Sequence, residues 1–521
     1  MVWKTFRSRT SRSPPVPEGP LASTTAGRIG GRYITRGPDG VEDRAPIEAF
    51  LGVPFAAAPI GDRRWRPPQP REPWDGIVEC VRPATAAVQV LRKPGGPLPA
   101  QTYAIGEDCL NLNVYTPACD DAKRPVFFWV HGGSYQNGRG ASNDGTQLCR
   151  NGDMVVVTVN YRMGLLGFID LAWLDRDRAG SHNLGIQDQI AALRWVRDNI
   201  ESFGGDPDQV TICGESAGAG SVLAILASPS ADGLFHRVIS QSAPAAFGPP
   251  HETVARNLAE HVGATSIDDL LALTADEILS AQDALLTAGT RALEQTDPPA
   301  LPDNAGRGFR PAIDGITVTR DAAHAAGERG VPIMIGTNDD EGTMFALHLD
   351  RAMTLDGLRA MAAQRVGDRA DEVIAAYQLE YPDFTPHQIA VQWMGDLRFW
   401  TCSLDVADAA SAAGTPVHVY RFGWKAQGLG GMFGAMHALE IPFVWQTMLG
   451  WDVAFGIEPP EALSDHLHRA WINYVRTGDP GHEGIGAWPR YDAATRPTMR
   501  FDEHTRVVDD PGAGTHRVWR N

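Results

Sequence analysis

Lysine is the scarcest charged residue in this chain of 521 residues, with only Lys4, Lys93, Lys123 and Lys425 present. No glycine precedes any of them, so the Gly-Lys pair of a Walker A phosphate loop is missing. No serine stands three residues before any of them, so the Ser-x-x-Lys nucleophile of β-lactamase-type enzymes is also missing. Two large classes of hydrolase are therefore excluded.

Cysteine is also scarce. The six cysteines form no Cys-x-x-Cys pair, and no His-Glu-x-x-His motif occurs. Neither a disulfide scaffold nor a zinc cluster is indicated, and we expect no metal and no organic cofactor.

Positive charge and long apolar runs are lacking as well. Lys plus Arg number 46 against 63 Asp plus Glu, a net charge of −17, and such a chain repels nucleic-acid phosphates. We expect no nucleic-acid partner, and no apolar run is long enough to predict a membrane span. Residues 1–20 are rich in Arg, Ser and Pro and lack an apolar signal core, which predicts a disordered tail and a cytoplasmic location. The sequence does not indicate the oligomeric state.

Residues 21–521 have a uniform globular composition, which predicts a single domain. Short β-branched runs, each followed by a glycine-rich turn or a helical pattern, predict strands at 126–130, 154–159, 210–213, 331–335 and 417–422 and helices at 183–203 and 222–226. This alternation predicts an α/β fold with a mostly parallel central sheet flanked by helices. We expect the Ala-rich stretches at 250–300 and 351–415 to be helical insertions over the active site, at one end of the sheet.

The segment from Gly214 to Gly218 fits the G-x-S-x-G pattern with Ser216 at its centre. A nucleophile on a sharp strand-to-helix turn needs small neighbours, because the flanking segments pack closely around it. The segment follows an expected strand and precedes an expected helix, which favours this interpretation. A glycine-rich packing turn is the alternative.

The segment His131-Gly132-Gly133-Ser134 follows another expected strand. An oxyanion needs preorganised N–H donors, and glycines let the backbone approach a substrate closely enough to supply them. Alone the tetrapeptide also fits an ordinary turn, but paired with the serine turn it predicts an oxyanion loop.

A serine nucleophile needs a base and an acid, which follow it in the order acid then His in α/β-hydrolases. Asp339, Asp340 and Glu341 are candidate acids after an expected strand, and His437 lies beyond them after a glycine-rich run. Spacing does not choose among these acids or among the 15 histidines. Three adjacent acids also fit a solvated turn.

Eight further segments, spread along nearly the whole chain, match motifs of one enzyme family in the order in which that family has them: 50–56, 64–68, 107–115, 160–162, 203–207, 337–342, 434–443 and 477–480. Together with the serine turn they resemble the type-B carboxylesterases. This family of α/β-hydrolases includes bacterial p-nitrobenzyl esterases, animal carboxylesterases and cholinesterases. The resemblance implies that Ser216 is the nucleophile, Glu341 the triad acid and His437 the base.

The expected reaction is hydrolysis of small to medium esters through an acyl-enzyme. Because a neutral imidazole would act as the base, kcat/KM is expected to fall below about pH 6.5.

The resemblance also implies an oxyanion hole made by the backbone N–H groups of Gly133, Ser134 and Ala217. Many family members have Gly or Ala where Ser134 stands, so this side chain is a departure. The family often bridges the cysteine matching Cys109 to one about 20 residues earlier. Cys80 is displaced from that position, and we expect no bridge.

The substrate is less clearly indicated. Five large side chains lie near segments that, by resemblance, surround the active site: Tyr135, Trp393, Trp400, Met432 and Trp445. Such a lining would favour apolar or aryl esters, although core packing explains each residue equally well. The net charge favours neutral or cationic esters over anionic ones.

Three rival functions share the fold. A carbamate or amide hydrolase would use the same triad, a lipase would act at a lipid–water interface, and some relatives are binding proteins that have lost the nucleophile. The presence of Ser216, Glu341 and His437 argues against the binding protein.

Overall fold

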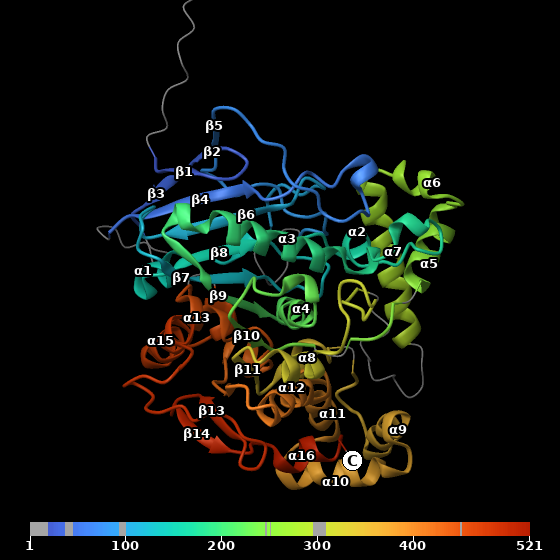
Figure 1. Ribbon diagram of the computed structural model, residues 1–521. Coiled ribbons are helices and arrows are strands. Elements are labelled where there is room, and N and C mark those ends of the chain that lie inside the picture. Colours follow the sequence, from blue (N-terminus) through green and yellow to red (C-terminus); the bar gives the residue numbers. More distant parts are fainter. Residues whose placement is uncertain are drawn as a thin grey trace, which may run out of the picture.

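The computed structural model describes residues 19–36, 45–92, 101–244, 247–250, 252–294, 309–347, 349–448 and 451–520. Residues 1–18 of the expected tail lie outside this part. A sheet of eleven strands runs through the molecule in the order β14-β13-β12-β11-β10-β9-β7-β8-β6-β4-β3 (Figure 1). Its strands are β3 (Arg32–Ile34), β4 (Ile47–Pro54), β6 (Asn111–Thr116), β7 (Arg124–Val130), β8 (Val155–Val159), β9 (Gly205–Glu215), β10 (Arg237–Gln241), β11 (Ile333–Asn338), β12 (Val417–Phe422), β13 (Pro497–Phe501) and β14 (Arg506–Asp509).

The centre of the sheet, from β8 through β7 and β9 to β13, is parallel. Every residue of β8, β11 and β12 is buried, as expected where helices cover both faces. Antiparallel strands complete both edges, and β1 (Leu21–Ser23), β2 (Arg28–Gly30) and β5 (Ile77–Glu79) form a separate small sheet. The predicted α/β class with a mostly parallel sheet is confirmed.

The strand that leads to the serine turn is longer than its β-branched run. β9 begins at Gly205 because β7 pairs with it from Gly205 to Gly214, so hydrogen bonding extends the strand beyond the residues that favour it. The helix expected at 183–203 is α3 (Leu184–Asn199), followed by a 3₁₀ turn over Ile200–Phe203.

The other helices are α1 (Thr146–Gly152), α2 (Gly164–Gly167), α4 (Ala217–Leu226), α5 (Thr253–Val262), α6 (Ile267–Leu271), α7 (Ala275–Glu294), α8 (Ala322–Arg329), α9 (Leu355–Val366), α10 (Ala370–Glu380), α11 (Pro386–Gly395), α12 (Thr401–Ala412), α13 (Ile441–Trp445), α14 (Asp452–Phe455), α15 (Glu461–Thr477) and α16 (Ala513–Arg517). Helices α3, α4, α8 and α12 share one apolar core with the sheet, while α1, α13 and α15 share a second. The sheet is thus a middle layer between two helical layers.

The described residues of the two Ala-rich stretches are largely helical, as predicted. Figure 1 shows α5, α6 and α7 grouped beside α2, with α9, α10 and α16 forming another group near the C-terminus. The carboxyl ends of parallel strands share one edge of the sheet, so the loops after β7, β9, β11 and β12 meet there. These loops carry all the predicted site residues. No helix in the described part of the chain is long and apolar enough to span a membrane.

Candidate active site

Ser216 occupies a strained turn between β9 and α4. Its backbone has φ 55° and ψ −122°, which is unusual for a residue with a side chain. A Cβ at Gly214 would lie 2.4 Å from the Gly218 backbone, and one at Gly218 would lie 2.0 Å from the carbonyl oxygen of Val130. Both glycines are therefore required by the close approach of strand and helix, and the resulting strain holds the serine at the edge of the sheet.

The loop after β7 brings backbone N–H groups to the same place. Gly133 has φ 114°, and a Cβ there would lie 2.0 Å from the carbonyl oxygen of Asn137, so only glycine fits. Ser134 and Tyr135 follow with φ 56° and 58°. Ala217 is the first residue of α4, so its N–H has no acceptor within the helix. Ser134 and Ala217 both line the pocket that contains Ser216.

His131 supports this loop. Its Nδ1 lies 2.8 Å from the carbonyl oxygen of Gly132, its ring stacks on Tyr161 at 4.6 Å, and the Tyr161 hydroxyl donates a hydrogen bond to the His131 carbonyl oxygen. Burial lowers the pKa of His131 to about 4, so the ring stays neutral. These contacts indicate that His131 holds the loop after β7 in its conformation.

The predicted acid and base are in direct contact. Glu341, just after β11, lies with its Oε2 2.5 Å from Nδ1 of His437. Its other oxygen, Oε1, accepts hydrogen bonds from the backbone N–H of Asn338 at 2.7 Å and from the hydroxyl of Ser242 at 2.5 Å. Both residues of the pair are buried. The carboxylate is therefore fixed in one orientation, and it fixes the imidazole in turn.

The two acids that precede Glu341 have other partners. Asp339 forms an ion pair with Arg421 at 3.2 Å. Asp340 forms one with Lys425 at 2.5 Å and accepts the backbone N–H of Ala435 at 2.6 Å, which joins the acid loop to the loop that bears the histidine. These contacts separate the three adjacent acids, which spacing alone did not.

A second carboxylate in contact with the histidine was not foreseen from the sequence. Glu215 is buried, and its Oε1 lies 3.2 Å from Nε2 of His437. In the described part of the chain, His437 Nε2 has no hydrogen-bond partner and so no bond to Ser216. Such bonds are often loose in ligand-free enzymes and tighten when substrate binds. The sequence held one signal for this contact: Glu215 is a charged residue at the end of the buried strand β9.

The two carboxylates change the titration of the histidine. Burial opposes a charge on His437, but Glu215 and Glu341 outweigh it and raise its pKa to about 9. Burial raises the pKa of Glu215 to about 8. His437 therefore takes up a proton at a higher pH than an ordinary imidazole, for which the sequence predicts about pH 6.5.

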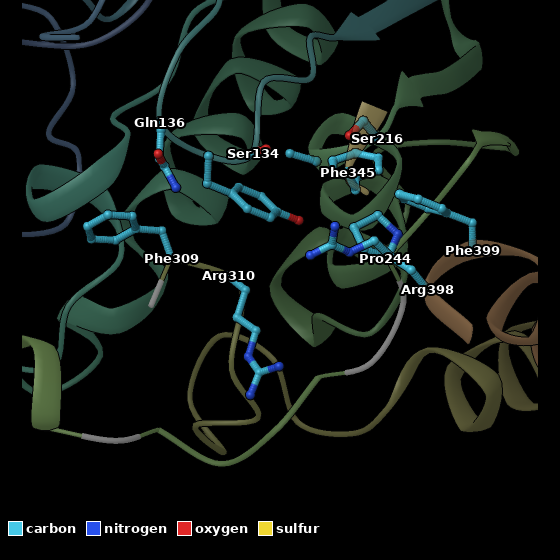
Figure 2. Close-up of a pocket in the computed structure, with 11 residues that line it drawn as sticks. Ser134, Gln136, Ser216, Pro244, Phe309, Arg310, Phe345, Arg398 and Phe399 are labelled. Carbon is cyan, nitrogen blue, oxygen red and sulfur yellow. The ribbon is translucent and has the colours of Figure 1, made fainter. Parts of the chain in front are cut away.

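The pocket around Ser216 contains about 550 Å³ of space outside the protein atoms, its open mouth included. Figure 2 shows its lining, which consists of Ser134, Tyr135, Gln136, Ser216, Ala217, Pro244, Phe309, Arg310, Phe345, Arg398 and Phe399. Phe399 stacks on the His437 ring at 4.7 Å, and Phe345 meets the ring edge-on at 5.1 Å. Arg398 and Phe399 belong to a π-helical turn, Asp396–Trp400, between α11 and α12.

The predicted aromatic lining is correct only for Tyr135. Trp393 and Trp445 are fully buried in separate apolar clusters, so the core-packing alternative holds for them. Trp400 lines a different cavity, and Met432 is 41% exposed. The other aromatic walls are Phe309, Phe345 and Phe399, which come from three segments that the sequence pattern did not distinguish. All six cysteines are free in the structure, Cys109 included.

The sheet, the strained serine and the buried acid–histidine pair agree with one family. The Carboxylesterase family model matches residues 18–519, and the chain belongs to this family: it is a serine carboxylesterase with the α/β-hydrolase fold. It is similar to the para-nitrobenzyl esterase of Bacillus subtilis, at 34% identity over 89% of this chain and 93% of that one. The phenmedipham hydrolase of Pseudarthrobacter oxydans is also 34% identical, over 96% and 97% of the two chains. A solved carboxylesterase structure from Geobacillus stearothermophilus has a TM-score of 0.82 at 34% identity, covering 96% and 99%.

Proposed function

We propose that Ser216, His437 and Glu341 are the catalytic triad of this carboxylesterase. The observation that carries this proposal is the 2.5 Å contact between buried Glu341 and His437 Nδ1, at the sheet edge that also holds the strained Ser216. An acid hydrogen-bonded to Nδ1 leaves Nε2 as the proton acceptor. Gly133, Ser134 and Ala217 are proposed as the oxyanion donors, supported by the glycine-only backbone of Gly133 and the unshared helix N-terminus at Ala217.

In the proposed reaction, Ser216 Oγ attacks the ester carbonyl while His437 Nε2 takes the hydroxyl proton. Glu341 stabilises the imidazolium, and the oxyanion binds to the backbone N–H groups. His437 then gives the proton to the leaving alcohol, which departs and leaves an acyl-enzyme. Water attacks the acyl carbonyl by the same route and releases the acid.

The substrates proposed are small to medium esters with apolar or aryl groups, which the phenylalanine walls of the pocket support. We also propose that residues 21–521 act as one catalytic domain, supported by a family match that extends over nearly all of them. The cytoplasmic location stays a prediction.

The proposal is tested by the burst of 4-nitrophenolate from 4-nitrophenyl butyrate at high enzyme concentration. Wild type should release about one equivalent before steady state, and Ser216→Ala should show no burst. A burst of equal size from folded Ser216→Ala would contradict the assignment. A matched carbamate in the same assay separates esterase from carbamate hydrolase activity, and we expect the ester to react faster.

A further inference from the structure

The pocket around Ser216 differs in charge from the rest of the protein. The whole chain has a net charge of −17, yet the described residues that line this pocket include Arg310 and Arg398 and no carboxylate. The buried acids Glu215 and Glu341 contact the two ring nitrogens of His437, Nε2 and Nδ1, and are not among the described residues of the lining. The surface that meets a substrate is therefore positive, although the chain is acidic.

Arg398 is held in position by aromatic contacts. Its guanidinium lies 4.6 Å from the ring centroid of Phe345 and 5.9 Å from that of Phe399. Figure 2 shows the side chain reaching from the Phe399 side into the middle of the pocket, below Ser216. The two rings hold the positive charge of Arg398 at the wall of the pocket.

Arg310 comes from a different segment, next to the Phe309 wall, and it is partly buried. Among the described residues, no carboxylate forms an ion pair with it. Burial raises the pKa of Tyr135, and the charge of Arg310 opposes that rise, so its positive field reaches the pocket wall. Arg310 is thus a second cation that lines the pocket, and it comes from another segment than Arg398.

We propose that the substrates of this enzyme carry a carboxylate in addition to the ester that is cleaved, and that Arg398 and Arg310 bind it. The inference rests on the proposed function, because it needs Ser216 as the reacting group. An arginine fork matches a carboxylate geometrically, and charge-assisted hydrogen bonds are stronger where apolar walls exclude water. The phenylalanine walls fit the apolar segment between the two groups.

The negative net charge does not oppose this inference inside the pocket. Exposed charges farther away than about 8 Å are largely screened at physiological salt. The acidic surface therefore slows the approach of an anion, whereas the arginines of the pocket act on the bound substrate. The net charge of the chain predicts a preference for neutral or cationic esters. In this proposal the arginines of the pocket give a preference for anionic esters instead.

The test compares two esters that differ by one charge, mono-4-nitrophenyl adipate and its isosteric terminal carboxamide. The readout is the ratio of kcat/KM for the acid over the amide, which cancels general effects on turnover. Wild type should favour the acid. The double variant Arg310→Gln, Arg398→Gln should lower the ratio by about 30-fold, or about 2 kcal/mol. Arg398→Lys keeps the positive charge, so using it in place of Arg398→Gln should restore part of the lost ratio.

Arg197→Gln on α3 is the matched control, because this arginine is half exposed, pairs with Asp198 and does not line the pocket. It should leave the ratio unchanged. If the double variant does not fold, Arg310→Gln alone answers the question and should lower the ratio in the same direction. Equal ratios in wild type and the arginine variants would overturn the inference, with Arg398 then serving only to pack against Phe345. Failure of wild type to hydrolyse either ester would instead overturn the proposed function.

Discussion

The carboxylate of Glu215 is expected to set the pH at which His437 becomes a base. Two unit charges 3.2 Å apart attract by about 5 kcal/mol at an effective dielectric constant of about 20, which corresponds to about 4 pH units. Burial of the imidazolium opposes this attraction, and burial also raises the pKa of Glu215 to about 8, so its carboxylate is only partly ionised near neutral pH. We therefore expect Glu215→Gln to lower the pKa of His437 by about 1 to 2 pH units.

The sign of the effect follows from the base needing a neutral ring. In wild type, kcat/KM for 4-nitrophenyl butyrate should fall as the pH drops through the raised pKa of His437, and in Glu215→Gln the same fall should come at lower pH. The plateau at high pH should also be lower, because the imidazolium formed during the reaction loses a neighbouring carboxylate.

Glu372→Gln on α10 is the control for this experiment, since its side chain is 52% exposed and pairs with Arg369. It should leave the profile unchanged. Superimposable profiles for wild type and folded Glu215→Gln would refute the argument, because the 3.2 Å contact would then carry no interaction in solution.

Four further predictions follow from the same geometry. Ser216→Ala should lower kcat for 4-nitrophenyl butyrate by about 10⁴–10⁶-fold with the fold intact by circular dichroism, and a smaller loss would point to another nucleophile. Glu341→Gln should lower kcat by about 10³-fold or more, because the amide favours the wrong histidine tautomer. Ser242→Ala removes one hydrogen bond to Glu341 and should lower kcat/KM by about tenfold, which an unchanged value would contradict. Gly218→Ala places a methyl group 2.0 Å from the Val130 carbonyl oxygen and should destabilise folding by about 3 kcal/mol in urea denaturation; a loss below about 1 kcal/mol would show that the turn relaxes.

The sequence predicts the parts of the site that depend on local pattern. β-branched runs place β7, β9 and β11, and the polar residues that follow them meet because parallel strands end at one edge. It does not predict the partners that hold these residues. Ser242 follows β10 and reaches Glu341 after β11, a contact between loops of neighbouring strands that no short-range signal encodes.

The choice among acids illustrates the same limit. Asp339, Asp340 and Glu341 are equivalent by spacing, and only the resemblance selected one. In the structure the difference is set by distant partners, since Arg421 pairs with Asp339 and Lys425 with Asp340. The sequence does not predict the pocket walls for a related reason: Phe309, Phe345 and Phe399 come from three separate segments, and no local pattern groups them.

The π-helical turn of Asp396–Trp400 is a place where the loss of one residue would change the lining of the pocket around Ser216. Within it, consecutive residues serve two cavities: Phe399 faces the pocket of Ser216, while Trp400 lines the cavity beside Arg421. Loss of a single residue would tighten this wide turn to an ordinary α-helical one and rotate the side chains on one side of it by about 100° relative to the other. We expect such a deletion to move Arg398 and Phe399 relative to the pocket while Ser216, Glu341 and His437 keep their places, and so to change the lining of the pocket without touching these three residues.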